Sequence, residues 1–242
     1  MGEGQAYPEA VICVPGEWQS QQDFVRSIAK MSDGYVFAGR ILLEMKTHAS
    51  FELQFEGHDP RMLEAFRASG RHWQDTDEMA RIAGHSSVAY LIGHGGSRKN
   101  AEALMAAAAG VIRAGGLGVK VESTGVAHAP AVWLDLTSHT HLFSAYRAFV
   151  VCVSGDEVYS CGMHNLGLRD VIVDAGDADD PSHLVNTFAY YTFTESPVIR
   201  DGQTFGVAPG APVYHIHEDD GVSYESGSLF TNPYGTWRLM PC

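Results

Sequence analysis

The chain has 242 residues, 45% of them hydrophobic, and a formal net charge of −13 from 16 Lys and Arg against 29 Asp and Glu. A chain of this length and composition buries a core of its own, which excludes disorder as the default state. The negative field repels nucleic acid and anionic lipid, so we expect no nucleic-acid or membrane partner and, if a macromolecule binds, a basic protein. The simpler interpretation, which we favour, is that moderate acidity only keeps the protein soluble.

The sequence also lacks the usual features of an exported or membrane-bound chain. No apolar stretch reaches the roughly 20 residues that a bilayer span needs. The N-terminal residues Met1-Gly2-Glu3-Gly4-Gln5 carry acid where a secretory signal carries Lys or Arg. The cysteines are not spaced as in a disulfide-bonded scaffold. There are four of them: Cys13, Cys152, Cys161 and Cys242. We therefore expect a cytoplasmic protein with reduced thiols.

In chain order, the first part of the sequence predicts a strand, a helix, two strands and a second helix. The expected ranges are residues 10–14, 20–34, 35–45, 51–55 and 59–70. The apolar positions of the first helix recur at helical spacing. Phe51, Leu53 and Phe55 alternate with Glu52 and Gln54, which indicates a sheet with one face in water.

The middle of the chain predicts a short helix at residues 75–83, a strand at 87–92, an Ala-rich helix at 97–114 and a strand at 119–122. Two assignments of the strand at 87–92 are open. It is either the fourth strand of a ferredoxin-like unit or the first strand of the second half.

The last part predicts, in order, a helix, a hairpin of two strands, a third strand, a helix and two further strands. The ranges are residues 139–146, 149–153 with 158–163, 171–173, a helix opened at 180–181, 204–207 and 213–217. Hairpins recur among interleaved helices, which favours an α+β class over a doubly wound parallel sheet. We expect two pseudo-similar, ferredoxin-like α/β-sandwich halves with mixed or antiparallel sheets. The halves cover residues 1–84 and 85–242, unless both form one compact domain.

One string is specific enough to carry a family resemblance, Tyr159-Ser160-Cys161-Gly162-Met163-His164-Asn165-Leu166-Gly167-Leu168. Four further segments add to it, at residues 35–42, 118–123, 201–205 and 232–239. Together they resemble, across nearly the whole chain, the bacterial family catalogued as domain of unknown function 4261. The resemblance implies a bacterial origin and a shared fold. It implies no activity and transfers no catalytic residue, because none is assigned to the family.

The first candidate site is the pair Cys161 and His164, with Glu122, His128 and Asp170 as further catalytic candidates. A thiol needs a nearby base or cation to become the thiolate that attacks a substrate or binds a metal, and Cys-x-x-His spacing permits this. One such pair is not a zinc signature, which needs two further ligands. The alternative, which we favour, is a thiol packed in a strand beside a tight polar turn.

His215 and His217 form the second candidate, a metal site. On a strand both imidazoles point to one face, and Glu218 offers a carboxylate for a divalent metal. Exposure on a polar edge strand explains the same residues and is the interpretation we favour. The pair His139 and His141 has less weight, because positions i and i+2 diverge on the helix expected there.

Gly95, Gly96 and Ser97 are the third candidate, an anion site between a strand and a helix. Free backbone N–H groups and the positive end of the helix can hold a phosphate or a carboxylate in such a loop. The string fits neither the P-loop pattern nor the dinucleotide-binding pattern Gly-x-Gly-x-x-Gly, so an ATP or NAD enzyme is disfavoured. A flexible turn is the more common meaning. We predict no cofactor and leave a divalent metal open.

No Gly-x-Ser-x-Gly, His-Glu-x-x-His or Cys-x-x-Cys motif is present. The leading hypothesis is therefore a non-catalytic binding or regulatory protein whose acidic surface meets a basic protein. The alternative is a small-molecule enzyme or metal-binding protein that uses Cys161 and His164, so the sequence leaves enzymatic activity undecided. It gives no indication of oligomeric state, substrate or pathway.

Overall fold

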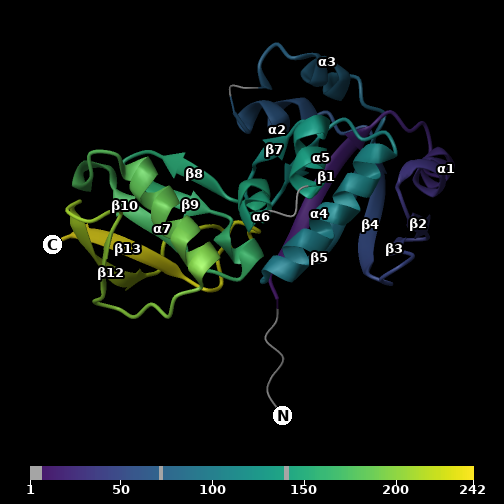
Figure 1. Ribbon diagram of the computed structural model, residues 1–242. Coiled ribbons are helices and arrows are strands. Elements are labelled where there is room, and N and C mark those ends of the chain that lie inside the picture. Colours follow the sequence, from purple (N-terminus) through teal and green to yellow (C-terminus); the bar gives the residue numbers. More distant parts are fainter. Residues whose placement is uncertain (1–6, 71–72, 139–141) are drawn as a thin grey trace.

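The computed structural model describes residues 7–70, 73–138 and 142–242. Figure 1 shows two β-sheets side by side, the first from the N-terminal part of the chain and the second from the C-terminal part. Helix α6 (Leu142–Phe149) lies between them. None of the described helices is long and apolar enough to cross a membrane.

The first sheet has its strands in the order β2-β3-β4-β5-β1-β6-β7, and every neighbouring pair is antiparallel. The strands are β1 (Glu9–Gly16), β2 (Tyr35–Ala38), β3 (Ile41–Glu44), β4 (Ser50–Gly57), β5 (Ser87–His94), β6 (Val119–Val121) and β7 (Ala127–His128). The expected alternation is present in β4, where Leu53 is fully buried and Glu52 is exposed. The single strand expected at residues 35–45 is instead the hairpin of β2 and β3, which turns at Gly39 with a φ of 62°.

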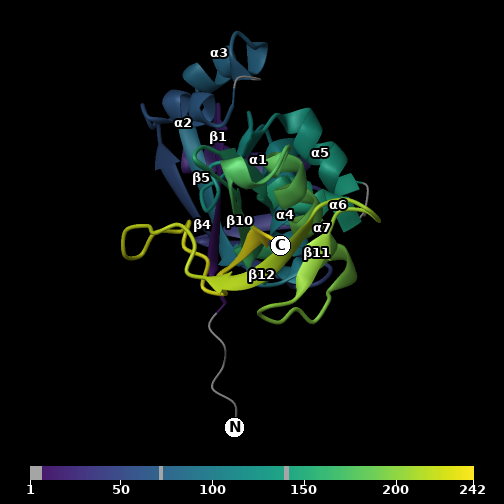
Figure 2. The same ribbon diagram turned by 90° about the vertical axis from the view of Figure 1, so that its left-hand side faces the viewer.

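Helices pack on both faces of the first sheet. On one face lie α1 (Gln21–Met31), α4 (Arg98–Arg113), α5 (Pro130–Ser138) and α6. On the other face α2 (Met62–Ala68) and α3 (Asp77–Ala83) cover Cys13 and Val88. Figure 2 shows α2 and α3 on the opposite side of the sheet from α5 and α6.

The second sheet has its strands in the order β11-β12-β13-β10-β9-β8, and only the pair β10 and β13 is parallel. The strands are β8 (Val151–Ser154), β9 (Glu157–Cys161), β10 (Asp170–Asp174), β11 (Thr204–Gly206), β12 (Val213–Asp219) and β13 (Thr236–Pro241). Helix α7 (Pro181–Glu195) packs on one face, and the short 3₁₀ helices η2 (Met163–Leu166) and η3 (Ala175–Asp177) flank β10. Within the described ranges, no helix covers the other face (Figure 1).

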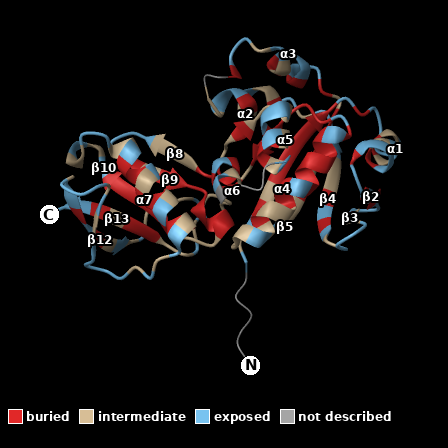
Figure 3. Cartoon of the chain, viewed as in Figure 1, coloured by how far each residue is buried: buried red, intermediate tan, exposed pale blue. Residues whose placement is uncertain are grey.

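One apolar core runs through both halves. Its largest cluster joins Ile12 and Leu91 of the first sheet to Phe149 of α6 and to Val171 and Phe188 of the second half. Figure 3 shows buried stretches, in red, on the strands beneath α4 and α7. A smaller cluster lies under α2 and α3. The two sheets therefore share most of their core rather than burying two separate ones.

The α+β class is confirmed, with one antiparallel and one mixed sheet. The strand expected at residues 87–92 is β5, which pairs between β1 and β4 in the first sheet. β6 and β7 belong to the same sheet, so the chain passes from the first sheet to the second between residues 128 and 151. We expected the boundary between the halves after residue 84. The two halves also have different strand orders. Of the helix expected at residues 139–146, the first three residues, and with them His139 and His141, lie outside the described ranges.

The substitution Leu53→Ala is expected to lower the free energy of unfolding by about 2–5 kcal/mol, because it opens a cavity at a fully buried position. Gln54→Ala, one residue along on the opposite face, is the matched control and is expected to cost less than about 0.5 kcal/mol. Urea unfolding followed by circular dichroism measures both. Equal losses of unfolding free energy in the two variants would mean that β4 does not have one buried face and one solvent-exposed face.

Candidate functional site

The string around Cys161 forms a tight turn where the two halves meet. Gly162 and Gly167 flank η2 with φ of 116° and 81°, values that favour glycine. A Cβ at position 162 would overlap the carbonyl oxygen of Phe149, and one at position 167 would overlap the carbonyl oxygen of Gly96. The glycines therefore allow the backbone of the turn to lie directly against α6 and against the loop before α4.

Polar contacts tie the same turn to the first half. The hydroxyl of Ser123 donates to the Asn165 side-chain oxygen at 3.0 Å, and the Asn165 amide donates to the Gly162 carbonyl at 3.1 Å. The backbone N–H of Gly96 donates to the His164 carbonyl at 3.1 Å. Asn165 is fully buried with these partners in place, so the motif is a structural joint between the halves.

Cys161 carries a buried thiol that is 4% exposed. Burial, and next the charge of Asp170, raise the pKa of this thiol to about 12. A hydrogen bond with Tyr224 acts in the opposite direction but is the smaller effect. The thiol is therefore protonated at neutral pH, which is the reverse of a poised nucleophile.

His164 has a fully buried ring, and neither ring nitrogen has a hydrogen-bond partner among the described residues. The carbonyl of Leu229 lies close enough to the ring to favour the charged form of the imidazole, but the two groups do not have the geometry of a hydrogen bond. Burial is the larger effect and lowers the pKa of the imidazole to about 4. His164 is not among the groups that act on the Cys161 thiol, so the two do not form a thiolate–imidazolium pair.

Asp170, at the start of β10, has a buried carboxylate that accepts several hydrogen bonds. Its Oδ1 accepts from the Ser160 hydroxyl at 2.9 Å and from the Met163 N–H at 3.2 Å, and its Oδ2 accepts from the Asn232 amide at 2.6 Å. Burial raises the pKa of the Asp170 carboxyl to about 6, and the hydrogen bonds oppose that shift, with the one from Asn232 the largest of them.

The other two catalytic candidates lie elsewhere. Glu122 pairs with Lys120 at 2.9 Å, and its charge adds to burial in raising the pKa of the Cys13 thiol. His128 Nε2 lies 3.1 Å from the carbonyl oxygen of Ala148. Neither residue acts on the Cys161 thiol. The five candidates are therefore not brought together in one site.

Cys161 and Asp170 do share a cavity of about 40 Å³ under the loop that connects β12 to β13. Tyr159 and Tyr224 line it with them, whereas Glu122, His128 and His164 do not. A volume of this size holds up to about three waters, since one water needs roughly 10–15 Å³ of this measure. The cavity is too small for an organic substrate unless the loop moves.

The loop proposed for anion binding is filled by the chain itself. Gly95 donates its N–H to the carbonyl of Pro8 at 2.8 Å, and Gly96 donates to the carbonyl of His164 at 3.1 Å. The Ser97 hydroxyl caps the first turn of α4. Two of the N–H groups that an anion needs therefore already have partners, and the loop serves as part of the joint.

His215 and His217 share one face of β12, as predicted, with ring centroids 6.0 Å apart. β12 pairs with strands on both sides, so it is not the edge strand that we expected. His217 Nδ1 lies 3.3 Å from an oxygen of Asp201, and Glu218, the carboxylate expected to complete the site, pairs with Arg169 instead. No cluster of three or more possible metal ligands exists in the part of the chain that the structure describes.

Sequence reasoning missed Arg238, which forms ion pairs with three carboxylates of the second half. From β13 its guanidinium donates to Asp219 at 2.7 Å, to Asp174 at 2.8 Å and to Glu157 at 2.7 Å. These carboxylates come from β12, β10 and β9, so one side chain ties four strands together on the face without a helix. The four residues are far apart in the sequence, and only the register of the paired strands brings their side chains together. The sequence analysis did not predict that register.

A family model described as Domain of unknown function (DUF4261) matches residues 159–239, about a third of the chain. The match confirms the resemblance over this segment, which runs from β9 to β13. Three of the segments that carried the resemblance lie inside it, and those at residues 35–42 and 118–123 lie outside. No curated protein and no solved structure matches the chain.

Gly167→Ala is expected to destabilise the protein by several kcal/mol, because the new Cβ meets the Gly96 carbonyl in addition to the strain of a positive φ. Gly202→Ala is the matched control, since Gly202 has a φ of 78° and open space around it. That control is expected to cost about 1–2 kcal/mol from strain alone. Thermal unfolding of both variants measures the difference, and equal shifts would contradict close contact at the joint.

Cys161 is expected to react with iodoacetamide at pH 7.5 at least about 1000-fold more slowly than an ordinary exposed thiol, because so little of it is thiolate. The exposed Cys242 is the reference within the same molecule. Peptide-resolved mass spectrometry over a time course measures both rates. Labelling of Cys161 as fast as that of Cys242 would restore the case for a reactive thiol.

Proposed function

We propose that the protein is a non-catalytic binding or regulatory protein whose second half presents an acidic surface to a basic protein. The observation that carries this proposal is the distribution of charge. Residues 151–242 hold thirteen Asp and Glu against three Arg and no Lys, a formal charge of minus ten. Residues 1–150 hold sixteen acidic against thirteen basic side chains, a charge of minus three. Charge needed only for solubility has no reason to collect in one half.

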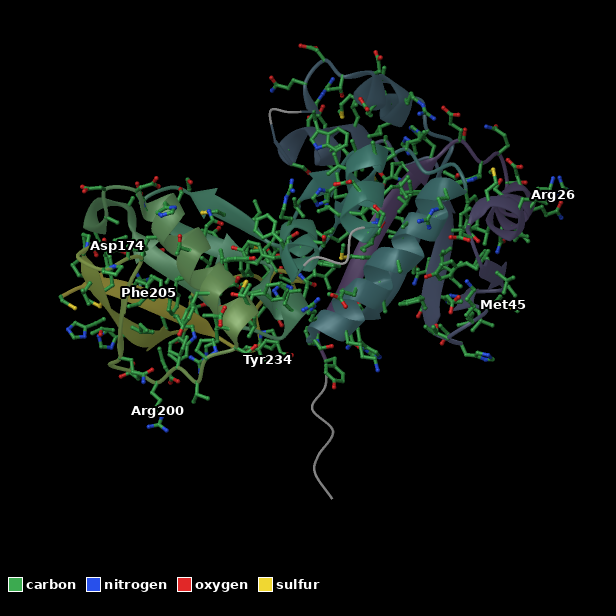
Figure 4. The ribbon with its side chains drawn as sticks, in the orientation of Figure 1. Arg26, Met45, Asp174, Arg200, Phe205 and Tyr234 are labelled. Atoms are coloured by element: carbon green, nitrogen blue, oxygen red, sulfur yellow. The ribbon has the colours of Figure 1, made fainter. Side chains whose placement is uncertain are left out.

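The position of the acidic side chains supports the proposal further. Arg238 neutralises part of the helix-free face by binding three carboxylates, of which Asp174 is labelled in Figure 4. Asp156, Asp179 and Glu225 are exposed and form no salt bridge with any described residue. These carboxylates are available to the Lys and Arg side chains of a partner, and such pairs mainly raise the association rate and give specificity.

The alternative, a small-molecule enzyme or a metal-binding protein centred on Cys161 and His164, has less support. The thiol of Cys161 is protonated, the imidazole of His164 is neutral, and of these two residues only Cys161 lines the cavity. Catalysis by a thiolate needs a lowered thiol pKa and a base within hydrogen-bond reach. We place the protein in a bacterial cytoplasm, in keeping with its four free cysteines and with the family resemblance.

The proposal is tested by affinity capture from a lysate of the source organism at low salt. The wild-type chain is expected to retain a reproducible basic protein that is released as the salt concentration rises. A variant with Asp156→Asn, Asp179→Asn and Glu225→Gln is expected to bind that protein about tenfold more weakly, at roughly 0.5 kcal/mol for each exposed pair lost.

The matched control removes three exposed acidic groups of the first half, by Glu9→Gln, Asp33→Asn and Glu56→Gln. It is expected to bind as the wild type does. No reproducible partner at low salt, or equal weakening by both triple variants, would count against an acidic binding surface in the second half.

A further inference from the structure

A loop without regular secondary structure closes the cavity beside Cys161. This closing loop, residues 220–235, connects β12 to β13 and contributes six of the twelve residues that line the cavity. Phe230 lies against Gly125 of the first half, and Tyr234, which is labelled in Figure 4, lies against Gly96 at the joint. The loop therefore crosses from the second half to the first and forms one wall of the cavity.

Asn232 holds the middle of the closing loop to the sheet. Its side-chain amide donates to the Leu168 carbonyl at 3.0 Å and to the Asp170 carboxylate at 2.6 Å. Its side-chain oxygen accepts the N–H of Tyr234 at 2.9 Å, which shapes the return of the loop. The backbone of Asp170 adds one further bond, from its N–H to the Gly235 carbonyl at 3.2 Å. Asp170 is thus the anchor of the loop through both its side chain and its backbone.

Among the described residues that line the cavity, no positive group balances the Asp170 carboxylate. Its titratable neighbours are Cys161 and Tyr159 on β9, Tyr224 and Asp220 on the closing loop, and Tyr146 on α6. Of the described residues that line the cavity, none is Lys, Arg or His. Ionised Asp170 is therefore a buried charge stabilised by hydrogen bonds alone, and such a charge gains strongly from contact with water.

We propose that the closing loop is a gate over the cavity, and that the protonation state of Asp170 sets how often the gate opens. Protonated Asp170 is neutral and is accommodated under the closed loop. Ionised Asp170 favours the open form, in which water solvates the carboxylate and Cys161 becomes accessible. The gate is thus tighter in mild acid and looser at neutral pH.

The direction follows from proton linkage. Burial raises the pKa of Asp170 to about 6 in the closed form, whereas a solvated aspartate titrates near its ordinary value, about 4. The closed form therefore binds the proton more tightly than the open form does. The stability of the closed form relative to the open form is greatest at low pH and falls as the pH rises towards and through 6. From these two values, the opening equilibrium is expected to increase roughly tenfold between pH 5 and pH 7.5.

Hydrogen exchange followed by mass spectrometry tests this on the full chain. Peptides from residues 221–235 are expected to lose roughly tenfold in protection between pH 5 and pH 7.5, after correction for the intrinsic exchange rate. Peptides from β1 and β5 serve as the internal reference and are expected to show no such trend. A corrected protection of the closing loop that does not change over this range would overturn the proposal.

Two variants assign the effect to Asp170. Asp170→Asn cannot ionise there and is expected to abolish the pH trend, whereas Asp220→Asn, which removes a charge from the same cavity, is expected to keep it. A trend that persists in folded Asp170→Asn would overturn the proposal. Should that variant not fold, Asn232→Ala decides instead: we expect it to speed iodoacetamide labelling of Cys161 at least tenfold at constant pH, and an unchanged rate would show that the loop is no gate.

Discussion

The close backbone contact at the joint is the constraint on which the rest of the molecule depends. Gly162 and Gly167 bring the turn around η2 against the carbonyl groups of Phe149 and Gly96, at a distance that no other residue type permits. This contact joins the apolar surfaces of both sheets into one core. It also fixes where β9 ends and β10 begins, and so it places Cys161 and Asp170 under the closing loop.

Burial at the joint then decides the chemistry of the polar groups that lie there. Removing a side chain from water penalises its charged form, which keeps the Cys161 thiol protonated and the His164 imidazole neutral. Asp170 differs because several donors point at its carboxylate, so it stays close to the balance between its two forms. A motif that resembles a reactive pair is thus made unreactive by its surroundings, while an aspartate outside that pair acquires a pKa of about 6.

The charges of the second half fall into an internal and an outer set. The carboxylates of Glu157, Asp174 and Asp219 meet at Arg238 and hold the strands of the helix-free face in register. Exposed carboxylates such as Asp156 and Asp179 form no ion pair with any described residue, and in our proposal they are the ones that a basic partner meets. The same half therefore uses negative charge both for its own stability and for recognition.

The sequence alone determined the local features: the α+β class, the alternation in β4, most helices and strands, and the orientation of His215 and His217. These depend on neighbours along the chain, through helical or two-residue periodicity. The partner of each strand, the environment of Cys161 and the meeting of Arg238 with three carboxylates were decided only by tertiary structure. Pairing between distant strands and burial against distant segments set them, and neither leaves a periodic signal in the residues concerned.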